Sequence, residues 1–329
     1  MLIDQFNRHV SYLRLSVTDR CDFRCIYCMS EDMTFLPRTS ILSLEELYEI
    51  ASAFVELGGR KIRLTGGEPL IRRGVESLIT RIGSLPQLEH LAITTNGSQL
   101  SRQAQQLKAS GVDSLNISLD SLKADRFKEL TRTGDLDQVV AGIVEAKRLG
   151  IPKIRLNSVI IKGKNDDEIL DLIDFALAQG IDIAFIEEMP LGEMPDVDRA
   201  QRWLSNQELR QRVEQHLTLI DEIQDSSAAG PARYAKIQGT ATRIGFISPH
   251  SHNFCGDCNR IRVTVEGRLL LCLGNEHSVD LRSILRAPDY HRDQLLQAFK
   301  DAMQIKPEKH HFLDPSEPQI LRFMNATGG

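Results

Sequence analysis

The 329-residue chain lacks long apolar runs and lacks an excess of positive charge. No apolar run reaches the roughly 18 residues that a membrane span needs, so we expect no membrane-spanning helix. The formal net charge at pH 7 is −5. Proteins that bind nucleic acid in general are usually basic, so we expect no nucleic-acid partner. Any polyanion site must then be a local cluster of Lys and Arg.

The N-terminus also lacks the features of an export signal. Its first ten residues, MLIDQFNRHV, include an acidic residue and no apolar central region. We therefore expect a cytoplasmic protein. Thiols stay reduced in that compartment, so the six cysteines are expected to be metal ligands or free thiols rather than disulfides.

No short repeat and no long low-complexity tract is present, and the first two-thirds of the chain alternates between strand-like and helix-like segments. Helices are expected between the strands, the first near 43–57, where Ser43 and Glu46 form a capping-box pattern. Six units of this kind predict an α/β fold with a parallel sheet, as a partial TIM-like (β/α)6 barrel or a doubly wound layer. The predicted strands are 12–17, 61–65, 90–95, 114–120, 153–161 and 182–188.

The pattern changes after about residue 195. A helix is expected near 205–216 and another near 290–303, with short strand-like pieces between them at 242–247, 260–265 and 268–273. The chain ends in NATGG, which predicts a flexible tail. We therefore expect a barrel domain at 1–225 and a C-terminal region at 226–329.

Three cysteines follow the first predicted strand with the spacing C-x3-C-x2-C. They are Cys21, Cys25 and Cys28. Three thiolates on one short loop can bind three irons of a [4Fe–4S] cluster and leave the fourth iron open to a small molecule. Zinc is an alternative, although structural zinc usually takes four protein ligands. Three incidental or redox-active thiols are the other alternative.

Two motifs together make the chain resemble the radical S-adenosylmethionine (SAM) superfamily. One is the cysteine motif with Tyr27 before its third cysteine, and the other is Thr65-Gly66-Gly67-Glu68-Pro69 after the second strand. The resemblance implies that the cluster splits SAM into methionine and a 5′-deoxyadenosyl radical, which abstracts hydrogen from a substrate. It implies SAM contacts at Tyr27, Gly67, Glu68, Ser118 and Met189. Taken singly, Ser118 and Met189 also fit ordinary packing at strand ends.

The remaining cysteines form a second triad with the spacing C-x2-C-x13-C. They are Cys255, Cys258 and Cys272. A second cluster with an open iron could bind a substrate directly, whereas a zinc site would need His250 or His252 as a fourth ligand. Arg260 and Arg262 lie on one side of the next predicted strand, and guanidinium groups suit an anionic ligand such as a phosphate.

Across its whole length the chain resembles the GTP 3′,8-cyclase family, also called molybdenum cofactor biosynthesis protein A. The resemblance is carried by LRLSVTDRCDFRCIYCM, KIRLTGGEPLIRR, ITTNG, NISLDSL, FCGDCNRIR, the cysteine after RLLL, and the terminal Gly328-Gly329. It implies a radical SAM-type partial barrel and a C-terminal extension that carries a second [4Fe–4S] cluster. The implied reaction removes the 3′ hydrogen of GTP and joins C3′ to C8, giving (8S)-3′,8-cyclo-7,8-dihydroguanosine 5′-triphosphate.

The same resemblance implies a set of GTP-binding residues, most of them basic. Taken singly, each cation is a better match to a solvated surface charge, and Thr94 to a buried strand hydroxyl. Taken jointly, at strand ends around two cysteine triads, they indicate a binding site. The set is Arg14, Lys61, Arg63, Thr94, Arg155, Arg260, Ile261 and Arg262, and the catalytic roles fall to Arg260, Arg262, Gly328 and Gly329.

Two positions depart from the family pattern. Arg155 stands where the family usually has Lys, which keeps the charge and changes the hydrogen-bond geometry. Ala184 stands where the family usually has Arg, so one cation of the site is missing. The terminal Gly328-Gly329 is implied to enter the active site, where residues without side chains fit a narrow space.

Further partners are implied by the resemblance alone. They are an electron donor of the flavodoxin or ferredoxin type, cyclic pyranopterin monophosphate synthase as the next enzyme, and a second copy of the chain in a homodimer. Two other functions stay open at this point. One is a radical SAM enzyme that acts on a peptide or another substrate and uses an auxiliary cluster, and the other is a non-catalytic zinc-binding protein.

Overall fold

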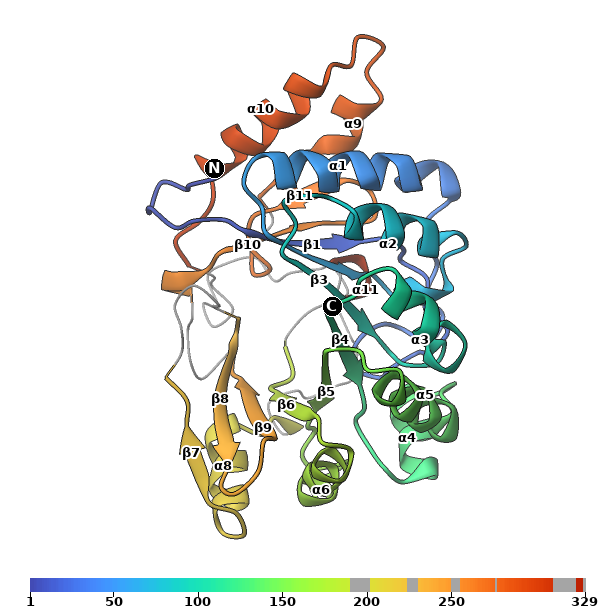
Figure 1. The fold of residues 1–329 in the computed structure, drawn as a ribbon, viewed down its shortest axis with the longest axis vertical. Coiled ribbons are helices and arrows are strands. Elements are labelled where there is room, and N and C mark those ends of the chain that lie inside the picture. The colour runs from blue at the N-terminus through green and yellow to red at the C-terminus, as the bar shows by residue number, and fades with distance from the viewer. Residues whose placement is uncertain (190–201, 224–229, 250–254, 276, 310–323, 328–329) are drawn as a thin grey trace.

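The structure is a computed structural model that describes residues 1–189, 202–223, 230–249, 255–275, 277–309 and 324–327. Within these residues, twelve strands form one continuous sheet in the order β12-β11-β10-β1-β2-β3-β4-β5-β6-β9-β8-β7. Figure 1 shows this sheet curving like an arch from β10 and β1 through β4 to β9 and β8. The strands at its two edges, β12 and β7, do not pair with each other, so the barrel is open.

The first six strands are those that the sequence predicts, within two residues at each end. All six are parallel. They are β1 (Tyr12–Ser16), β2 (Lys61–Thr65), β3 (His90–Thr95), β4 (Ser114–Ser118), β5 (Lys153–Val159) and β6 (Asp182–Ile186).

The strands of the C-terminal region extend both edges of this sheet. β9 (Arg243–Ile247) runs parallel to β6, and β10 (Arg260–Val263) runs parallel to β1. The other four strands add antiparallel pairs outside them. These are β7 (Leu219–Asp221), β8 (Ala232–Ile237), β11 (Arg268–Leu270) and β12 (Ser278–Asp280).

Helices cover the outer, convex face of the sheet (Figure 1). Ser43 and Glu46 form the predicted capping box of α1, since the Glu46 amide donates to Ser43 Oγ at 3.1 Å and the Ser43 amide donates to Glu46 Oε2 at 2.7 Å. Helices α1 to α6 are Leu44–Glu56, Val75–Gly83, Leu100–Ala109, Ala124–Thr131, Leu136–Arg148 and Ile169–Gln179. Later helices are α8 (Asn206–Glu214), α9 (Leu281–Leu285), α10 (Arg292–Met303) and α11 (Met324–Thr327).

Successive side chains along the strands point alternately to the hydrophobic core and to the concave face of the sheet. On β1, Leu13 and Leu15 are fully buried in the main hydrophobic core, against the helices. The residues that alternate with them, Tyr12 and Arg14, line a cavity on the other side. Parallel strands buried on both faces are usually apolar throughout, so polar alternation here indicates a concave face built for a polar ligand.

The structure confirms the predicted partial barrel and corrects one local expectation. The segment between β4 and β5 forms two helices, α4 and α5, because Arg132 adopts a φ of 60° and ends α4. The tail was expected to be loose, yet Met324–Thr327 form a helical turn in which Asn325 and Thr327 are buried. Gly328 and Gly329 lie outside the described residues. None of the described helices is both long enough and apolar enough to cross a membrane.

Candidate active site

The first cysteine triad lies on the loop that follows β1. Cys21, Cys25 and Cys28 all line one cavity of about 170 Å³ at the C-terminal ends of the strands. Asp22 fixes the loop, because its carboxylate accepts hydrogen bonds from Asn96 Nδ2 at 2.7 Å and from Ser98 Oγ at 2.6 Å. The three side chains that the sequence predicts to act together therefore face one space.

Burial opposes ionisation of these three thiols. It raises the pKa of Cys21 and Cys25 well above the ordinary value and that of Cys28 to about 12. A backbone hydrogen bond from Asn325 acts in the opposite direction on the pKa of Cys28. Thiols in such surroundings become thiolates when a metal binds, since the metal supplies the missing positive charge.

The donor set of the cysteine loop suits a cluster of irons. Each of the three thiolates can bind a different iron of one cluster, whereas structural zinc usually takes four protein ligands at one centre. The donor set of three cysteines with one side open therefore fits a [4Fe–4S] cluster.

The glycines after β2 are required by the close approach of the cysteine loop. A Cβ on Gly66 would lie 2.3 Å from the carbonyl oxygen of Thr18, and one on Gly67 would lie 2.2 Å from that of Arg20. Gly66 also has a φ of 147°. Side chains at either position would push this segment away from the loop, so both glycines shape the cavity that they line.

Glu68 is the fifth residue predicted to contact SAM, and that contact stays a prediction. Its side chain is fully buried and is hydrogen-bonded to Thr95 and Asn96, which line the cavity. Its oxygens accept hydrogen bonds from the amide of Asn96 at 2.6 Å, from Thr95 Oγ1 at 2.8 Å and from the amide of Leu70 at 2.9 Å. Burial raises the pKa of Glu68 to about 8, and these bonds oppose the rise. Glu68 thus holds the end of β3 against the cysteine loop.

The other four predicted SAM residues line the cysteine cavity. They are Tyr27, Gly67, Ser118 and Met189. The Tyr27 hydroxyl donates to Asp120 Oδ2 at 2.6 Å, and Asp120 also lines this cavity. Burial raises the pKa of Asp120 to about 6. The sequence analysis missed this carboxylate, although its place directly after β4 was a usable signal.

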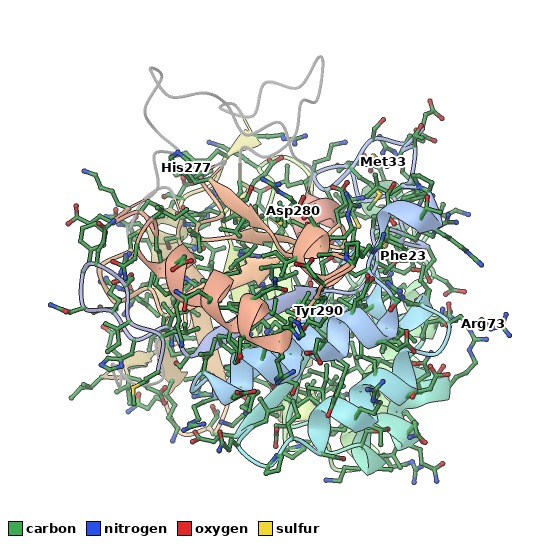
Figure 2. All side chains as sticks on the ribbon, turned by 90° about the horizontal axis from the view of Figure 1, so that it is seen from above. Phe23, Met33, Arg73, His277, Asp280 and Tyr290 are labelled. Carbon is green, nitrogen blue, oxygen red and sulfur yellow. The ribbon has the colours of Figure 1, made fainter. Side chains whose placement is uncertain are left out.

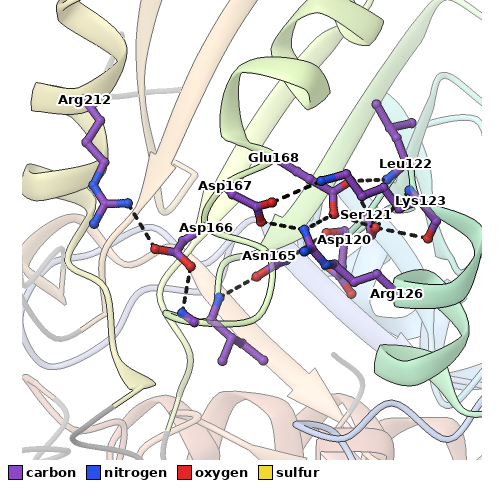
Figure 3. A network of polar contacts seen from close by, with 12 residues as sticks. Asp120, Ser121, Leu122, Lys123, Arg126, Asn165, Asp166, Asp167, Glu168 and Arg212 are labelled. Atoms are coloured by element: carbon purple, nitrogen blue, oxygen red, sulfur yellow. Dashed lines mark hydrogen bonds and ion pairs between the residues drawn. The ribbon is translucent and has the colours of Figure 1, made fainter.

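A hydrogen-bonded network outside the cavity holds Asp120 in place (Figure 3). Asn165 Nδ2 donates to the carbonyl oxygen of Asp120 at 2.7 Å. Glu168 accepts from the Ser121 hydroxyl at 2.8 Å and forms an ion pair with Arg126 at 2.6 Å. These contacts join the segment before α6 to the segment after β4. They therefore fix the orientation of the Asp120 carboxylate toward the cavity.

A second cavity, of about 410 Å³, adjoins the first. Both are lined by Asn157, Ile186, Met189 and Met324. The six predicted basic residues all line the second cavity: Arg14, Lys61, Arg63, Arg155, Arg260 and Arg262. The structure therefore brings these cations together beside the cysteine cavity.

Strand register arranges these residues in two rows across three neighbouring strands. Arg14 is in register with Arg262 on one side and with Arg63 on the other. Tyr12 is in the same way flanked by Arg260 and Lys61. Neighbouring strands lie about 4.8 Å apart, and like charges placed opposite one another on a sheet repel. An anion bound over the rows would offset this repulsion and so stabilise them.

The neighbouring cations strongly change the pKa of Tyr12, which lies at the centre of one row. Burial raises the pKa of Tyr12, but the charges of Arg63, Arg14 and Lys61 outweigh that effect and lower it to about 6. Arg63 Nε donates to the Tyr12 hydroxyl at 2.6 Å. Burial lowers the pKa of Arg14 to about 10. The cavity is thus a site of high positive potential.

Two predicted GTP contacts lie elsewhere. Thr94 lines the cysteine cavity, and its hydroxyl accepts a hydrogen bond from Arg63 Nη1 at 3.2 Å. Ile261 is only 1% exposed, and its side chain packs in the hydrophobic core, since it alternates with Arg260 and Arg262. A ligand in the cavity could meet Ile261 only through its backbone.

Cationic side chains surround the second cysteine triad. Lys306 is 1% exposed, and its ammonium group donates to the carbonyl oxygens of Leu271 at 2.6 Å and Arg260 at 3.1 Å. The same group lies 3.8 Å from Cys258 Sγ. Burial raises the pKa of Cys258, but the charges of Arg260 and Lys306 outweigh it, so the pKa falls below its ordinary value. Burial raises the pKa of Cys272.

A buried arginine supports the same triad from its other side. Arg8 Nη1 donates to the carbonyl oxygen of Cys255 at 2.7 Å, and Arg8 forms a buried ion pair with Asp4 at 2.7 Å. The sequence analysis missed both Arg8 and Lys306, because neither lies near the triad in sequence. His250 and His252, the possible zinc ligands, lie outside the described residues.

This chain has Ala184 where the family usually has an arginine. Tyr234 fills the space beside Ala184. Ala184 is fully buried against Ala232 and Ile247, with Tyr234 packed beside them. The Tyr234 hydroxyl is hydrogen-bonded to Arg155 Nη1. Another cation, Arg243, stacks on the Tyr234 ring with its Cζ atom 4.7 Å from the ring centroid. Both Tyr234 and Arg243 line the basic cavity.

The C-terminal turn lies between the two cavities. Met324 lines both of them, and α11 lies inside the arch of the sheet (Figure 1). Asn325 Nδ2 donates to the carbonyl oxygen of Asp19 at 3.1 Å, which ties the turn to the segment before the first triad. Gly328 and Gly329, which follow it, are outside the described residues, so their predicted place in the active site stays a prediction.

Comparison with known proteins gives matches along the whole chain. Residues 15–176 match the model of the radical SAM superfamily, and residues 181–312 match the model described as Molybdenum Cofactor Synthesis C. The chain is 59% identical to the GTP 3′,8-cyclase of Pseudomonas entomophila (strain L48) over 329 residues, which is 100% of this chain and 98% of that protein. It is 58% identical to the GTP 3′,8-cyclase of Pseudomonas putida (strain W619), with the same coverage.

Solved structures support the fold. SuiB from Streptococcus suis matches with a TM-score of 0.66 at 14% identity, over 98% of this chain and 79% of that chain. The crystal structure of SuiB bound to S-adenosylmethionine matches with a TM-score of 0.63 at 15% identity, over 98% and 77% of the two chains. At these identities the likeness concerns the architecture alone.

Proposed function

We propose, from the premise that this chain belongs to the GTP 3′,8-cyclase family, that its cysteine cavity binds a [4Fe–4S] cluster with SAM and that its basic cavity binds GTP. The chain is a radical SAM enzyme for the first step of molybdenum cofactor biosynthesis, in which GTP becomes 3′,8-cyclo-7,8-dihydro-GTP. One observation carries the assignment of the cavities. All six predicted cations line a single cavity, and it shares a wall with the cavity of the first triad.

Cys21, Cys25 and Cys28 would hold three irons of the first cluster. When bound, the cluster with SAM supplies a 5′-deoxyadenosyl radical that removes the 3′ hydrogen of GTP. Tyr27, Gly67, Ser118 and Met189 line the space for SAM. Asp120 adds a fixed carboxylate that can accept hydrogen bonds from hydroxyl or ammonium groups of SAM. These residues would position SAM beside the wall that the cysteine cavity shares with the basic cavity.

The rows of cations would hold the triphosphate of GTP. Arginine pairs with phosphate through two parallel hydrogen bonds, so the row of Arg262, Arg14 and Arg63 is suited to neighbouring phosphate oxygens. Neutralisation by the triphosphate would also relieve the repulsion within the row of Arg262, Arg14 and Arg63. Arg155, hydrogen-bonded to Tyr234, would supply positive charge that Ala184 does not, whereas Arg243 beside it is already paired with Asp182. The Thr94 hydroxyl would orient Arg63, and Ile261 would contact GTP only through its backbone atoms.

The second triad would hold a second [4Fe–4S] cluster with one open iron toward the guanine end of GTP. Cys258 lies two residues before Arg260, and Leu273, next to Cys272, lines the basic cavity. Arg8 and Lys306 would offset the negative charge of three thiolates and the cluster. A structural zinc ion bound with His250 or His252 is the competing occupant.

The remaining assignments extend this proposal. An electron donor of the flavodoxin or ferredoxin type would reduce the first cluster, and cyclic pyranopterin monophosphate synthase would take the product. The chain would act as a homodimer in the cytoplasm, where thiols stay available for iron. The terminal Gly328-Gly329 would enter the active site beside Arg260 and Arg262. A division into a barrel at 1–225 and a C-terminal region at 226–329 remains our proposal for the domains.

Anaerobic reconstitution followed by incubation with SAM, dithionite and GTP tests the proposal. We expect about eight irons per chain, since two clusters each contain four, and both 5′-deoxyadenosine and a cyclised guanosine nucleotide as products. A matched pair of variants locates GTP. Arg14→Ala should abolish cyclisation and keep deoxyadenosine formation, whereas Arg233→Ala, at an exposed position of β8, should change neither. Iron-free protein with one zinc per chain would contradict the assignment.

A further inference from the structure

A third basic site lies outside the two cavities, on the outer side of the loop that carries the first triad. It is a surface hollow of about 470 Å³ between the end of β1, the segment after β2 and the start of α1. Its wall contains the side chains of Arg20, Arg38, Arg72, Arg73 and Arg286, and we call it the arginine hollow. Such a concentration of positive charge is unusual in a chain whose formal net charge is −5.

Two of these arginines hold the hollow in shape. Arg72 Nη2 donates to the carbonyl oxygen of Leu42 at 2.6 Å, which ties the segment after β2 to the segment before α1. Arg286 Nε pairs with Glu46 Oε1 at 2.6 Å, which joins the end of α9 to the first turn of α1. The charge of Arg286 is therefore already partly neutralised.

The other three arginines of the hollow are exposed. Arg20, Arg38 and Arg73 form no ion pair with any residue in the described part of the chain. Figure 2 shows Arg73 extending from the edge of the molecule into solvent. The guanidinium of Arg20 lies 5.8 Å from the ring centroid of Phe35, which limits the directions it can take. Three cations around one hollow, without carboxylates to pair with, favour a negatively charged partner.

The wall of the hollow is also the wall of the cysteine cavity. Thr18 and Arg20 line the hollow, whereas Cys21, the next residue, lines the cavity. The amide of Gly67 donates to the carbonyl oxygen of Thr18 at 2.7 Å, and that of Glu68 donates to the carbonyl oxygen of Arg20 at 2.8 Å. A single backbone segment, which contains Thr18, Arg20 and Cys21, would thus lie between a partner bound in the hollow and a cluster bound in the cysteine cavity.

We propose that the arginine hollow is the docking surface for an acidic electron-transfer protein, whose carboxylates surround its redox group. The proposal rests on the proposed function in one respect, that a protein partner reduces the first cluster. In this step the reduced group of the partner loses one electron and the cluster gains it, and no bond forms or breaks. Opposite charges on the two surfaces speed the encounter and orient the partner's redox group toward Cys21.

Charge reversal on the rim of the hollow tests this proposal, with a purified flavodoxin as the probe. The variant Arg38→Glu/Arg73→Glu changes two exposed residues outside both cavities. At low ionic strength we expect it to bind flavodoxin about tenfold more weakly and to be reduced by it about tenfold more slowly than the unchanged chain. Added salt should shrink both differences, because salt screens exposed charges.

A matched control separates this effect from a change in overall charge. Arg233→Glu/Lys236→Glu makes the same change at exposed positions of β8, at the far end of the sheet (Figure 1). We expect this variant to bind and accept electrons like the unchanged chain. Equal losses in the two variants, or no loss in the hollow variant, would overturn the proposal.

Reduction by dithionite distinguishes a loss of partner docking from a loss of SAM cleavage. SAM cleavage driven by dithionite should be unchanged in the hollow variant, because that reductant needs no docking surface. A parallel loss with dithionite would mean that the substitutions damage the cysteine loop, which would also overturn the proposal. If no variant forms a cyclised nucleotide, the proposed reaction fails, while the flavodoxin-binding measurement still decides the role of the hollow.

Discussion

The ammonium group of Lys306 lies 3.8 Å from Cys258 Sγ and is buried with it. A cation at this place stabilises thiolate and, once a cluster is bound, its more negative, reduced form. Lys306 also satisfies two backbone carbonyl groups of the loop and strand that surround the triad. One side chain therefore links the shape of the second site to its charge.

Lys306→Met is expected to destabilise the second cluster and spare the first. The substitution removes the charge and leaves two buried carbonyl oxygens without their donor, at a cost of about 1–3 kcal/mol each. We expect reconstituted iron to fall from about eight towards four per chain, and any remaining second cluster to have a lower reduction potential by electron paramagnetic resonance titration. Lys300→Met, at an exposed position of α10, is the control. Full iron content with an unchanged potential would show that Lys306 only fills space.

Tyr234→Phe is expected to weaken GTP binding without impairing SAM cleavage. The variant loses the hydroxyl that is hydrogen-bonded to Arg155, and it keeps the ring on which Arg243 stacks. Loss of one hydrogen bond to a charged group, worth about 1.5–3 kcal/mol, corresponds to a rise in the KM for GTP of roughly tenfold or more, with kcat little changed. Tyr290→Phe, whose hydroxyl contacts Glu49 far from the cavities, should leave the KM unchanged. A fall in kcat alone would argue against a role in binding.

Ala184→Arg is expected to destabilise the protein rather than improve it. The side chain at 184 is fully buried, and a Cβ on neighbouring Gly245 would already lie 3.0 Å from the Tyr234 ring and 3.2 Å from Ala184 Cβ. A guanidinium group there must displace Tyr234 or stay buried without a partner, which costs several kcal/mol. We expect a clear drop in the midpoint of urea unfolding. Tighter GTP binding with normal stability would show instead that the site has room for the arginine.

Tyr12 is expected to ionise near neutral pH. Its pKa in the folded protein is about 6, below the ordinary value of 10, because of three neighbouring cations. Between these values the unfolded chain binds more protons, so this group makes stability rise with pH from about 6 to 10. Tyr12→Phe should remove that rise and the corresponding near-ultraviolet tyrosinate absorbance, and Tyr48→Phe should remove neither. Inorganic triphosphate should raise the pKa of Tyr12 in the unchanged chain, since it cancels the cationic charge.

Removal of Gly328 and Gly329 is expected to abolish cyclisation while SAM cleavage continues. The turn before them, Met324–Thr327, borders both cavities, so the next residues have little distance to cover to reach Arg260 and Arg262. Extension of the chain beyond Gly329 should have the same effect. The measurement is the ratio of cyclised nucleotide to 5′-deoxyadenosine. Cyclisation at the normal rate in both variants would disprove a role for the tail.

The sequence predicted much of the fold because its signals are local. Each of the first six strands is a short apolar stretch between helical patterns, and the capping box of α1 lies within four residues. The two cysteine triads were equally clear, since each has a fixed spacing. The basic residues were predicted as a set from the family resemblance, and only the pairs Lys61/Arg63 and Arg260/Arg262 have a two-residue spacing that indicates a shared strand face.

Other features depend on contacts between distant segments, which a single sequence does not reveal. Nothing near Ala184 indicates that Tyr234, fifty residues later, fills its side of the cavity. Lys306 and Arg8 reach the second triad only because the tertiary fold brings both chain ends to it. The hydrogen bonds of Glu68 depend on tertiary contacts in the same way, since two of its donors, Thr95 and Asn96, come from the end of β3 and the residue after it.

The pairing of β1 with β10 and of β6 with β9 has a consequence for biosynthesis. While the chain is being made, the first six strands leave the ribosome with both outer strands unpaired, and such edges invite aggregation. Pairing of these two strands must wait until the last third of the chain has been synthesised, and contacts so far apart in sequence form slowly. We therefore expect the nascent half-barrel to depend on chaperones, and iron to be inserted only after the C-terminal strands have added to both edges.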